Sequence, residues 1–308
     1  MSQDESKPSD IPELQPEERP LAGAWQPLTP RGVAAFSLAP VGRLLLIQFI
    51  IALLAAGAVV WFLATAWFPI LREGIRQLPE SGVIQDQQLS YPRPSTDPLA
   101  ENRFLALVVD LDGAGVASLA TDLRVEFHRR QVVLCAFPGC LGWNYPKGWV
   151  VQFNQPELES WWGAWETAIH LLIGLAVVAG LFANWLVLAT VYCPVARIYA
   201  FFKDRQLTLL GSWKLSAAAL LPGTLLSAAA LVLYAQGVID LLRCLVLWAL
   251  QLPVGWVYLF TSPLRLPRAS DALHAPGRNP FGREKPGLSN PFDSSEQRAT
   301  RNRVPGDQ

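Results

Sequence analysis

The chain has 308 residues, of which 51% are apolar and 16% are charged, whereas roughly 25% of the residues of an average soluble protein are charged. The formal net charge is zero, so the composition gives no reason to expect a nucleic-acid partner or a strongly acidic substrate. The surplus of apolar residues predicts that a large part of the chain lies where no water reaches.

The N-terminal part of the chain predicts a tail followed by a membrane anchor. Residues 1–35 are polar and rich in proline, with too few apolar side chains to offset the entropy of ordering, so we expect a disordered tail. Residues 36–69 predict an interfacial segment and a first membrane-spanning helix, whose apolar core at 44–67 matches the roughly 20 residues that such a helix needs. No small-residue cleavage site follows it, so we expect a retained anchor. Pro69 is expected to end or kink the helix.

Residues 70–163 predict a small domain made mainly of strands. A short amphipathic helix comes first, with apolar residues at helical spacing between 71 and 78. Short segments rich in β-branched and aromatic residues then predict strands at 83–89, 104–111, 123–127, 132–137 and 149–153. The turn residues Asp112 and Gly113, and a turn around 129–131, predict antiparallel hairpins between neighbouring strands.

Residues 164–262 predict a bundle of three further membrane-spanning helices. Their apolar cores lie at 167–191, 215–235 and 241–260. The first is expected to end at Cys193-Pro194, while Pro222 and Pro253 are expected to interrupt the other two. The predicted fold class is therefore a membrane α-helical protein with four transmembrane helices, a small extracytoplasmic β-rich domain and disordered termini.

The distribution of basic residues predicts the orientation of the chain. The loop after the second span carries four of them against one acid: Arg197, Lys203, Arg205 and Lys214. Because Lys and Arg near span ends favour the cytoplasmic side, we expect both termini, including a disordered tail at 263–308, in the cytoplasm and the β domain outside. Arg72 and Arg76 favour the opposite orientation but are outnumbered. The predicted location is the inner (cytoplasmic) cell membrane, with the lipid bilayer as the first partner.

Four stretches carry a resemblance to a known family. They are SLAPVGRLLLIQFIIALL at 37–54, IRQLPESGVIQDQQLSYP at 75–92, VVDLDGAG at 108–115 and KDRQLTLLGSWKLSAAALLPGTLL at 203–226. In these stretches the chain resembles bacterial multi-pass membrane proteins of unknown function, some of which are labelled maltodextrin utilisation proteins. The resemblance covers roughly residues 36–260 and implies an anchor, an extracytoplasmic β domain and a three-helix bundle, with no settled activity.

One stretch offers a catalytic candidate. An apolar strand running into Asp110-Leu-Asp112-Gly113 resembles the nucleophile loop of haloacid-dehalogenase-type phosphatases, where the first carboxylate attacks phosphorus and the second acts in proton transfer. That family usually has Thr where this chain has Ala114, and the domain is too short for a doubly wound sheet. Asp122 could add an oxygen, but the spacing is not that of a calcium loop. We therefore expect a strand that ends in a turn, with no enzyme and no metal.

The four cysteines fall into two groups. Cys135 and Cys140 lie in the predicted outward domain, where an oxidising space makes a disulfide physically reasonable, with two free thiols as the alternative. Zinc is not expected, because only His128 is close in sequence. Cys193 and Cys244 fall in the predicted spans, where a thiol usually packs as a small apolar group.

Polar residues within or near the predicted spans are candidates for contacts between helices. Asn184 and Gln251 lie in mid-span, where an amide can form a hydrogen bond with a neighbouring helix. Asp240 and Arg243 lie near the outer surface and can pair with each other at a spacing of three. A proton or ion pathway normally needs a buried acid, and none falls at the centre of a predicted span.

The sequence therefore predicts a non-enzymatic membrane scaffold whose outward β domain binds or senses a membrane or extracytoplasmic protein partner, with no cofactor and no nucleic acid. The alternative is an accessory subunit of a membrane transporter, for which the interrupted third and fourth spans and the sugar-related family label are the reasons. A phosphatase using Asp110 and Asp112 is the third hypothesis.

Overall fold

The computed structural model describes residues 26–92, 98–111, 121–137 and 139–268. Residues 267–308 belong to a separate compact unit, of which 267 and 268 are the described residues. Most of the two predicted disordered tails therefore lies outside the described residues. The architecture below concerns the chain up to Leu266.

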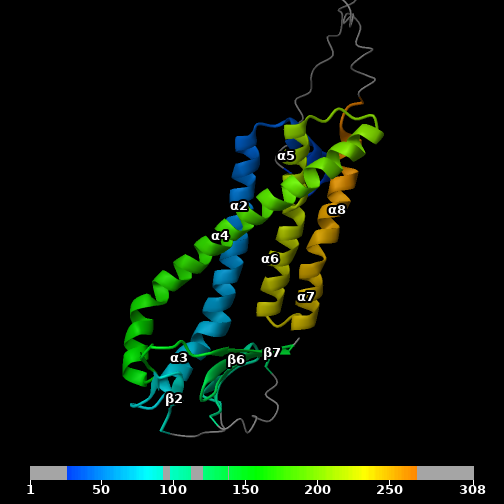
Figure 1. Cartoon of the computed structure of the whole chain (residues 1–308). Helices are drawn as coiled ribbons and strands as arrows, with labels where there is room; N and C mark the ends of the chain where they lie inside the picture. Colours follow the sequence, from blue (N-terminus) through cyan, green and yellow to red (C-terminus); the bar gives the residue numbers. More distant parts are fainter. Residues whose placement is uncertain (1–25, 93–97, 112–120, 138, 269–308) are drawn as a thin grey trace, which may run out of the picture. The chain divides into compact units, whose positions relative to one another are not determined.

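Within the described residues, four helices are long and apolar enough to cross a membrane, and they agree with the four predicted spans (Figure 1). They are Val41–Arg76, Gln155–Phe202, Leu209–Ala235 and Leu241–Arg265. The chain is thus of multi-span membrane type by length and composition of its helices.

The first long helix consists of α2 (Val41–Phe62), a π-helical turn η1 (Leu63–Trp67) and α3 (Phe68–Arg76). Pro69 does not end the helix, because it lies in the first turn of α3, where its missing N–H is tolerated. The widened turn before it also changes the backbone pairing, and Asn102 of the β domain donates a hydrogen bond to the carbonyl of Ala66 at 2.6 Å. At the predicted interruption the helix therefore contains a π turn, and a backbone carbonyl of this turn accepts a hydrogen bond from the β domain.

The second long helix, α4 (Gln155–Phe202), begins at Asn154, whose side chain accepts a hydrogen bond from the N–H of Glu157. The prediction that it ends at Cys193-Pro194 is wrong, because the helix continues through Pro194 to Phe202. Ala196 and Ala200 are fully buried beyond the proline. Packing of this last part against the bundle maintains the helix despite the missing backbone hydrogen bond.

The third and fourth long helices are each divided near their middle. They consist of α5 (Leu209–Ala219), α6 (Leu221–Ala235), α7 (Leu241–Ala249) and α8 (Gln251–Thr261), with a 3-10 turn η2 (Pro263–Arg265) at the end. The interruptions predicted from Pro222 and Pro253 are present, but they fall at Leu220 and Leu250. Each proline lies near the start of the following helix, where it is compatible with helical geometry.

A short helix near the N-terminus was not predicted. It is α1 (Pro30–Leu38), capped by the Thr29 side chain, which accepts a hydrogen bond from Gly32 N–H. The sequence analysis assigned these residues partly to the tail and partly to an interfacial segment. Val33 and Phe36 are instead fully buried in the bundle, because the apolar side of this helix packs against α5 and α8.

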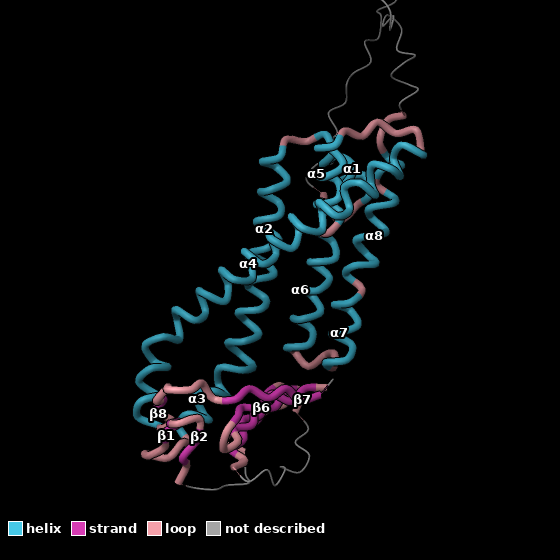
Figure 2. Tube along the Cα trace, viewed as in Figure 1, coloured by secondary structure: helices cyan, strands magenta, loops and turns pink. Residues whose placement is uncertain are grey.

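The strands form two sheets in the part of the chain that the structure describes (Figure 2). One has the order β2-β1-β8 and the other β3-β4-β5-β6-β7. Their bounds are β1 (Val83–Gln85), β2 (Gln88–Ser90), β3 (Ala100–Glu101), β4 (Leu105–Val109), β5 (Leu123–Phe127), β6 (Gln131–Ala136), β7 (Gly139–Asn144) and β8 (Val151–Gln152).

Strand pairing corrects one predicted hairpin and confirms another. β4 and β5 are parallel, with Leu105 opposite Leu123, so the prediction of an antiparallel hairpin at Asp112-Gly113 is wrong. Parallel neighbours need a crossover rather than a tight turn, and Asp112 and Gly113 themselves lie outside the described residues. β5 and β6 form the antiparallel hairpin predicted from the turn around 129–131.

The predicted strand at 83–89 is in fact a hairpin of β1 and β2. Its two turn residues, Asp86 and Gln87, have φ angles of 52° and 61°, which is the left-handed conformation of a two-residue hairpin turn. The sequence lacks the glycine or asparagine that normally marks such a turn, so the local pattern predicts one strand in place of the hairpin.

The core of the β domain lies between α3 and the two sheets. Its buried side chains come mainly from β1, β2 and β4: Leu78, Ile84, Leu89, Leu99, Leu105, Leu107, Val109, Tyr145 and Phe153. Gly74 of α3 allows the closest approach, since a Cβ there would lie 2.6 Å from a methyl carbon of Leu107. The small domain thus gains stability by packing on the end of a membrane helix.

Tyr145 provides a test of this core outside the helices. Burial raises the pKa of Tyr145 to about 12 from its usual 10.0, and the hydroxyl donates to the carbonyl of His128 at 2.9 Å. The fold favours the neutral phenol, so this contribution to stability is complete below pH 10 and is lost as the pH rises through 12. Titration of the phenolate absorbance of the wild-type protein and of Tyr145→Phe checks this, because the difference between the two curves belongs to Tyr145. We expect this difference to appear near pH 12 in the folded protein and near pH 10 after denaturation.

Candidate functional site

The candidate site is the junction between the five-stranded sheet and the turn that joins α6 to α7 (Figure 1). The hydroxyl of Tyr234, at the end of α6, donates to Oδ2 of Asp122 at 2.7 Å. The guanidinium of Arg103 donates to the carbonyl of Ile239 at 3.0 Å and to that of Gly237 at 3.5 Å. Side chains of the β domain therefore hold both the end of α6 and the turn after it.

An aromatic cluster lies beside these hydrogen bonds. The ring of Phe104 is 5.0 Å from the ring of Tyr234 and 5.5 Å from that of Phe62, measured between centroids. Both pairs have the edge-to-face arrangement that aromatic rings prefer. The cluster joins α2, α6 and the loop before β4, so the junction is apolar on one side and polar on the other.

The loop before β4 presents these side chains because Asn102 orders it. The Oδ1 atom of Asn102 accepts hydrogen bonds from the backbone N–H groups of Phe104 and Leu105, both at 2.8 Å. The backbone N–H of Asp122 also donates to the carbonyl of Arg103 at 3.0 Å. A tight local turn of this kind fixes Arg103, Phe104 and Asp122 as one unit against the helices.

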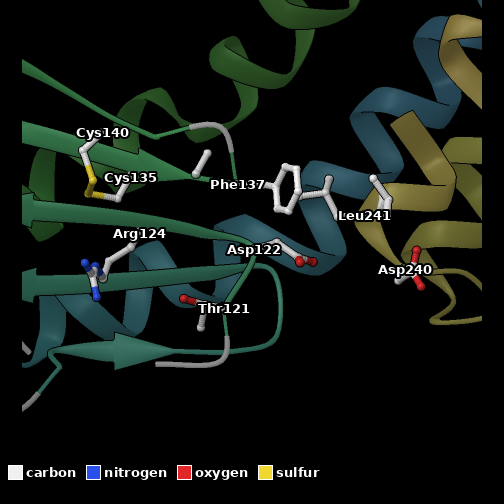
Figure 3. A pocket seen from close by; sticks show the side chains of 10 residues that line it. Thr121, Asp122, Arg124, Cys135, Phe137, Cys140, Asp240 and Leu241 are labelled. Atoms are coloured by element: carbon white, nitrogen blue, oxygen red, sulfur yellow. A yellow bond between two sulfur atoms is a disulfide. The ribbon is translucent and has the colours of Figure 1, made fainter. Parts of the chain in front are cut away.

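A cavity of about 510 Å³ opens at the junction (Figure 3). Phe137 extends from the end of β6 toward Leu241 at the start of α7. The described lining residues are Thr121, Asp122, Arg124, Cys135, Ala136, Phe137, Cys140, Asp240, Leu241 and Leu242. A volume of this size is within the roughly 300–1,000 Å³ of ligand pockets.

The charged groups of the cavity are largely engaged with neighbours. Arg124 forms an ion pair with Glu126, which also contacts His128 at 3.0 Å. Asp240 begins α7 and accepts from the N–H of Arg243 at 2.8 Å, and the two exposed side chains form an ion pair at 3.6 Å. Exposed ion pairs contribute little to stability. The cavity therefore offers a mixed polar and apolar surface.

The β6–β7 hairpin forms the outer wall of the site. Cys135 and Cys140 face each other in register and form a disulfide with a Cα–Cα distance of 4.0 Å. Phe137 at the turn is 74% exposed, and Leu141 and Trp143 on β7 are 63% and 56% exposed. An exposed apolar surface therefore adjoins the cavity.

The disulfide can be tested directly by alkylation. We expect the intact chain, denatured without a reductant, to be alkylated at Cys193 and Cys244, which are free thiols in the structure. Cys135 and Cys140 should react only after reduction. Mass spectrometry of the labelled peptides would contradict the pairing if all four cysteines reacted before a reductant was added.

The residues predicted from the sequence are distributed over three places. Asp240 lies at the junction and pairs with Arg243. Gln251 lies within the helices and accepts a hydrogen bond from Ser227 at 3.0 Å. Asn184 is exposed on α4.

The structure describes one of the two aspartates of the phosphatase candidate. Asp110 is 7% exposed at the end of β4, and its proposed partner Asp112 lies outside the described residues. Among the residues that the structure describes, no group of three or more His, Cys, Asp or Glu side chains could hold a metal ion.

Sequence reasoning missed the groups that join the domain to the helices. The sequence pattern marks Asp122 only as a possible oxygen ligand and gives no signal at Tyr234 or Arg103. Asp122 and Tyr234 are separated by 112 residues along the chain, and neither carries a local motif. Only the fold could have brought them together.

Comparison of the chain with protein-family models, with curated proteins and with solved structures found no match. The class of protein is therefore defined by the fold, as a multi-span helical membrane protein that carries a small β domain.

Proposed function

We propose that the chain is a non-enzymatic integral membrane scaffold that binds a polypeptide partner at the β6–β7 hairpin. The observation that supports this most is the outer strand β7, all six residues of which are exposed. β7 pairs with β6 and forms one end of the five-stranded sheet.

An edge strand of this composition is suited to pairing with another chain. Proteins usually protect such edges with charged residues, proline or a covering segment. β7 has the sequence GCLGWN, with no charge and no proline, and it presents Leu141 and Trp143. Addition of an extended segment to a sheet edge is a common mode of peptide recognition, in which the exposed side chains supply specificity.

The orientation that we propose places this edge on the extracytoplasmic side of the inner (cytoplasmic) membrane. The loop between α4 and α5 then lies in the cytoplasm. The arginines that favour the opposite orientation are paired in the structure. Arg72 forms an ion pair with Glu166, and Arg76 lies 3.9 Å from Glu159. The rule counts basic residues rather than net charge, so these two arginines still favour the opposite orientation, but four basic residues in and beside the α4–α5 loop outnumber them: Arg197, Lys203, Arg205 and Lys214.

Site-specific photo-cross-linking in native membranes tests the proposed edge. A photoreactive amino acid is placed in the full chain at Trp143, with Trp149 as the control because its side chain is also exposed, at 64%, outside β7. We expect a cross-linked polypeptide from position 143, weaker cross-linking from position 149, and loss of the first signal when Leu141→Glu is added. Equal cross-linking from both positions, or none from position 143, would contradict the proposal.

A second candidate is an accessory subunit of a transporter. Interrupted membrane helices are typical of transport proteins, where they form binding sites near the middle of the bilayer, and this chain pairs two of them. Co-purification of a permease with the full chain in mild detergent, unaffected by Leu141→Glu, would favour this candidate over the scaffold.

A further inference from the structure

The longest helix, α4, is largely exposed. Only 6% of its most apolar stretch is buried, against 61% for that of Leu209–Ala235. Figure 1 shows α4 crossing α2 obliquely, and it packs against α2 and α5. Its buried residues form one stripe along the helix: Trp185, Ala189, Cys193, Ala196 and Ala200. The rest of α4 therefore lies on the surface that a bilayer would cover.

Asn184 places an amide on this exposed surface, deep within the span. Its side chain is exposed, as are those of Val187 and Val191, at 59% and 57%, which follow it on the same side of the helix. Glu166 and Arg197 are the nearest charged residues of α4 on either side. Asn184 thus lies near the centre of the uncharged stretch, where its short side chain cannot reach the headgroups.

An amide at this depth is unfavourable unless other polar groups meet it, because hydrocarbon offers no hydrogen bonds. The amide has two N–H donors and an acceptor oxygen, so a carbonyl of its own helix could satisfy only part of it. The exposed hydroxyl of Thr190, by contrast, donates to the carbonyl of Leu186 at 2.7 Å and accepts from Nε1 of Trp213 at 3.3 Å. The amide of Asn184 therefore gains most from a second polypeptide in the membrane.

A second copy of the chain matches this position by symmetry. In a pair whose two-fold axis runs along the membrane normal, equivalent residues lie at the same depth. Two Asn184 amides can then meet, and each can donate to the oxygen of the other. The stretch between Glu166 and Arg197 contains no Lys, Arg, Asp or Glu, so the parallel alignment brings no like charges together within the hydrocarbon.

We propose that two copies of the chain associate through the exposed side of α4, with reciprocal hydrogen bonds between their Asn184 side chains. Val187 and Val191 pack beside this contact. A single asparagine on an apolar helix face fixes the register of the pair, because any shift separates the two amides. The association uses α4 alone, so it is independent of the partner-binding edge proposed above and of the orientation of the chain in the membrane.

Disulfide cross-linking in native membranes tests which side of α4 meets the second copy. In the full chain without Cys193 and Cys244, a cysteine is introduced at Val187 or, as the matched control, at Leu186, which is 58% exposed. Leu186 lies two residues after Asn184 and so faces away from it. With copper phenanthroline as the oxidant, we expect a disulfide-linked dimer from Val187→Cys and far less from Leu186→Cys. Equal cross-linking from both positions, no cross-link from Val187→Cys, or its cross-link to a different polypeptide would overturn the proposal.

Energy transfer between donor-labelled and acceptor-labelled chains measures the strength of the association. The purified full chain without Cys193 and Cys244 is labelled at a cysteine introduced at Gln206 and diluted with lipid in phosphatidylcholine vesicles. We expect Asn184→Leu to weaken the association about tenfold, because it removes two hydrogen bonds that each contribute roughly threefold in a membrane.

Two further variants show whether the amide itself is responsible. Asn184→Gln keeps an amide that can pair with its own copy and should retain most of the association. Thr190→Val removes a polar group that is already engaged within the chain and should leave the association unchanged. The proposal is overturned if the unsubstituted chain shows no energy transfer, or if Asn184→Leu weakens the association no more than Thr190→Val does.

Discussion

Replacing Gly223 by alanine is expected to destabilise the helical bundle by about 1–3 kcal/mol, the usual cost of inserting atoms into a well-packed interior. The added methyl group would lie 2.6 Å from the carbonyl oxygen of Gln251. That oxygen belongs to the backbone, so it cannot move aside as the end of a flexible side chain can. The two divided helices would have to separate, and their contacts at the interruptions would weaken together.

Gly180→Ala is the matched control. Gly180 lies in α4, and a Cβ there would meet nothing within 4 Å. Since alanine favours a helix over glycine by about 1 kcal/mol, this substitution should leave stability unchanged or raise it. Thermal unfolding of both variants in the same detergent separates the two cases. The proposed contact is contradicted if the two variants unfold at the same temperature.

Removing the hydrogen bond between Tyr234 and Asp122 is expected to have the second large effect. Tyr234→Phe and Asp122→Asn should each cost about 1.5–3 kcal/mol, as for hydrogen bonds that involve a charged group. The double variant should cost less than the sum of the two single variants, because both remove the same contact. Amide exchange in β5 and in the end of α6 should rise together, since the contact holds these two segments.

Asp240→Asn is the control for this cycle. It makes the same chemical change at an exposed carboxylate, and asparagine also caps helices well, so its effect should stay below about 1 kcal/mol. The account is contradicted if the stability losses of Tyr234→Phe and Asp122→Asn are strictly additive and amide exchange rises in only one of the two segments. The β domain and the helices would then not be coupled through this hydrogen bond.

The long helices could be predicted because their signal is local. A run of apolar residues as long as the bilayer is thick identifies a span without any knowledge of its neighbours, and the described part of the chain contains four such helices. The predicted ends of these helices were less accurate where packing against other helices determines how far a helix continues. The sequence at Pro194 resembles a helix end, but the buried Ala196 and Ala200 carry α4 further.

The β domain was predicted only in part, since strand pairing depends on contacts between distant residues. β5 was placed correctly, whereas β7 was missed because its sequence, GCLGWN, has two glycines and no β-branched residue. The parallel pairing of β4 with β5 has no local signature either. Gln251 could be identified as a candidate helix contact from its position, but its partner Ser227 could not.

Labelling of single cysteines in intact cells tests the proposed arrangement most directly. In a chain without Cys193 and Cys244, one cysteine is introduced at the exposed Lys147 of the β domain and, in a second variant, at the exposed Gln206 between α4 and α5. A reagent that cannot cross the membrane should label Lys147→Cys in intact cells and Gln206→Cys only after the cells are opened. Labelling of both positions in intact cells, or of Gln206→Cys alone, would contradict the outward β domain on which the proposed function depends.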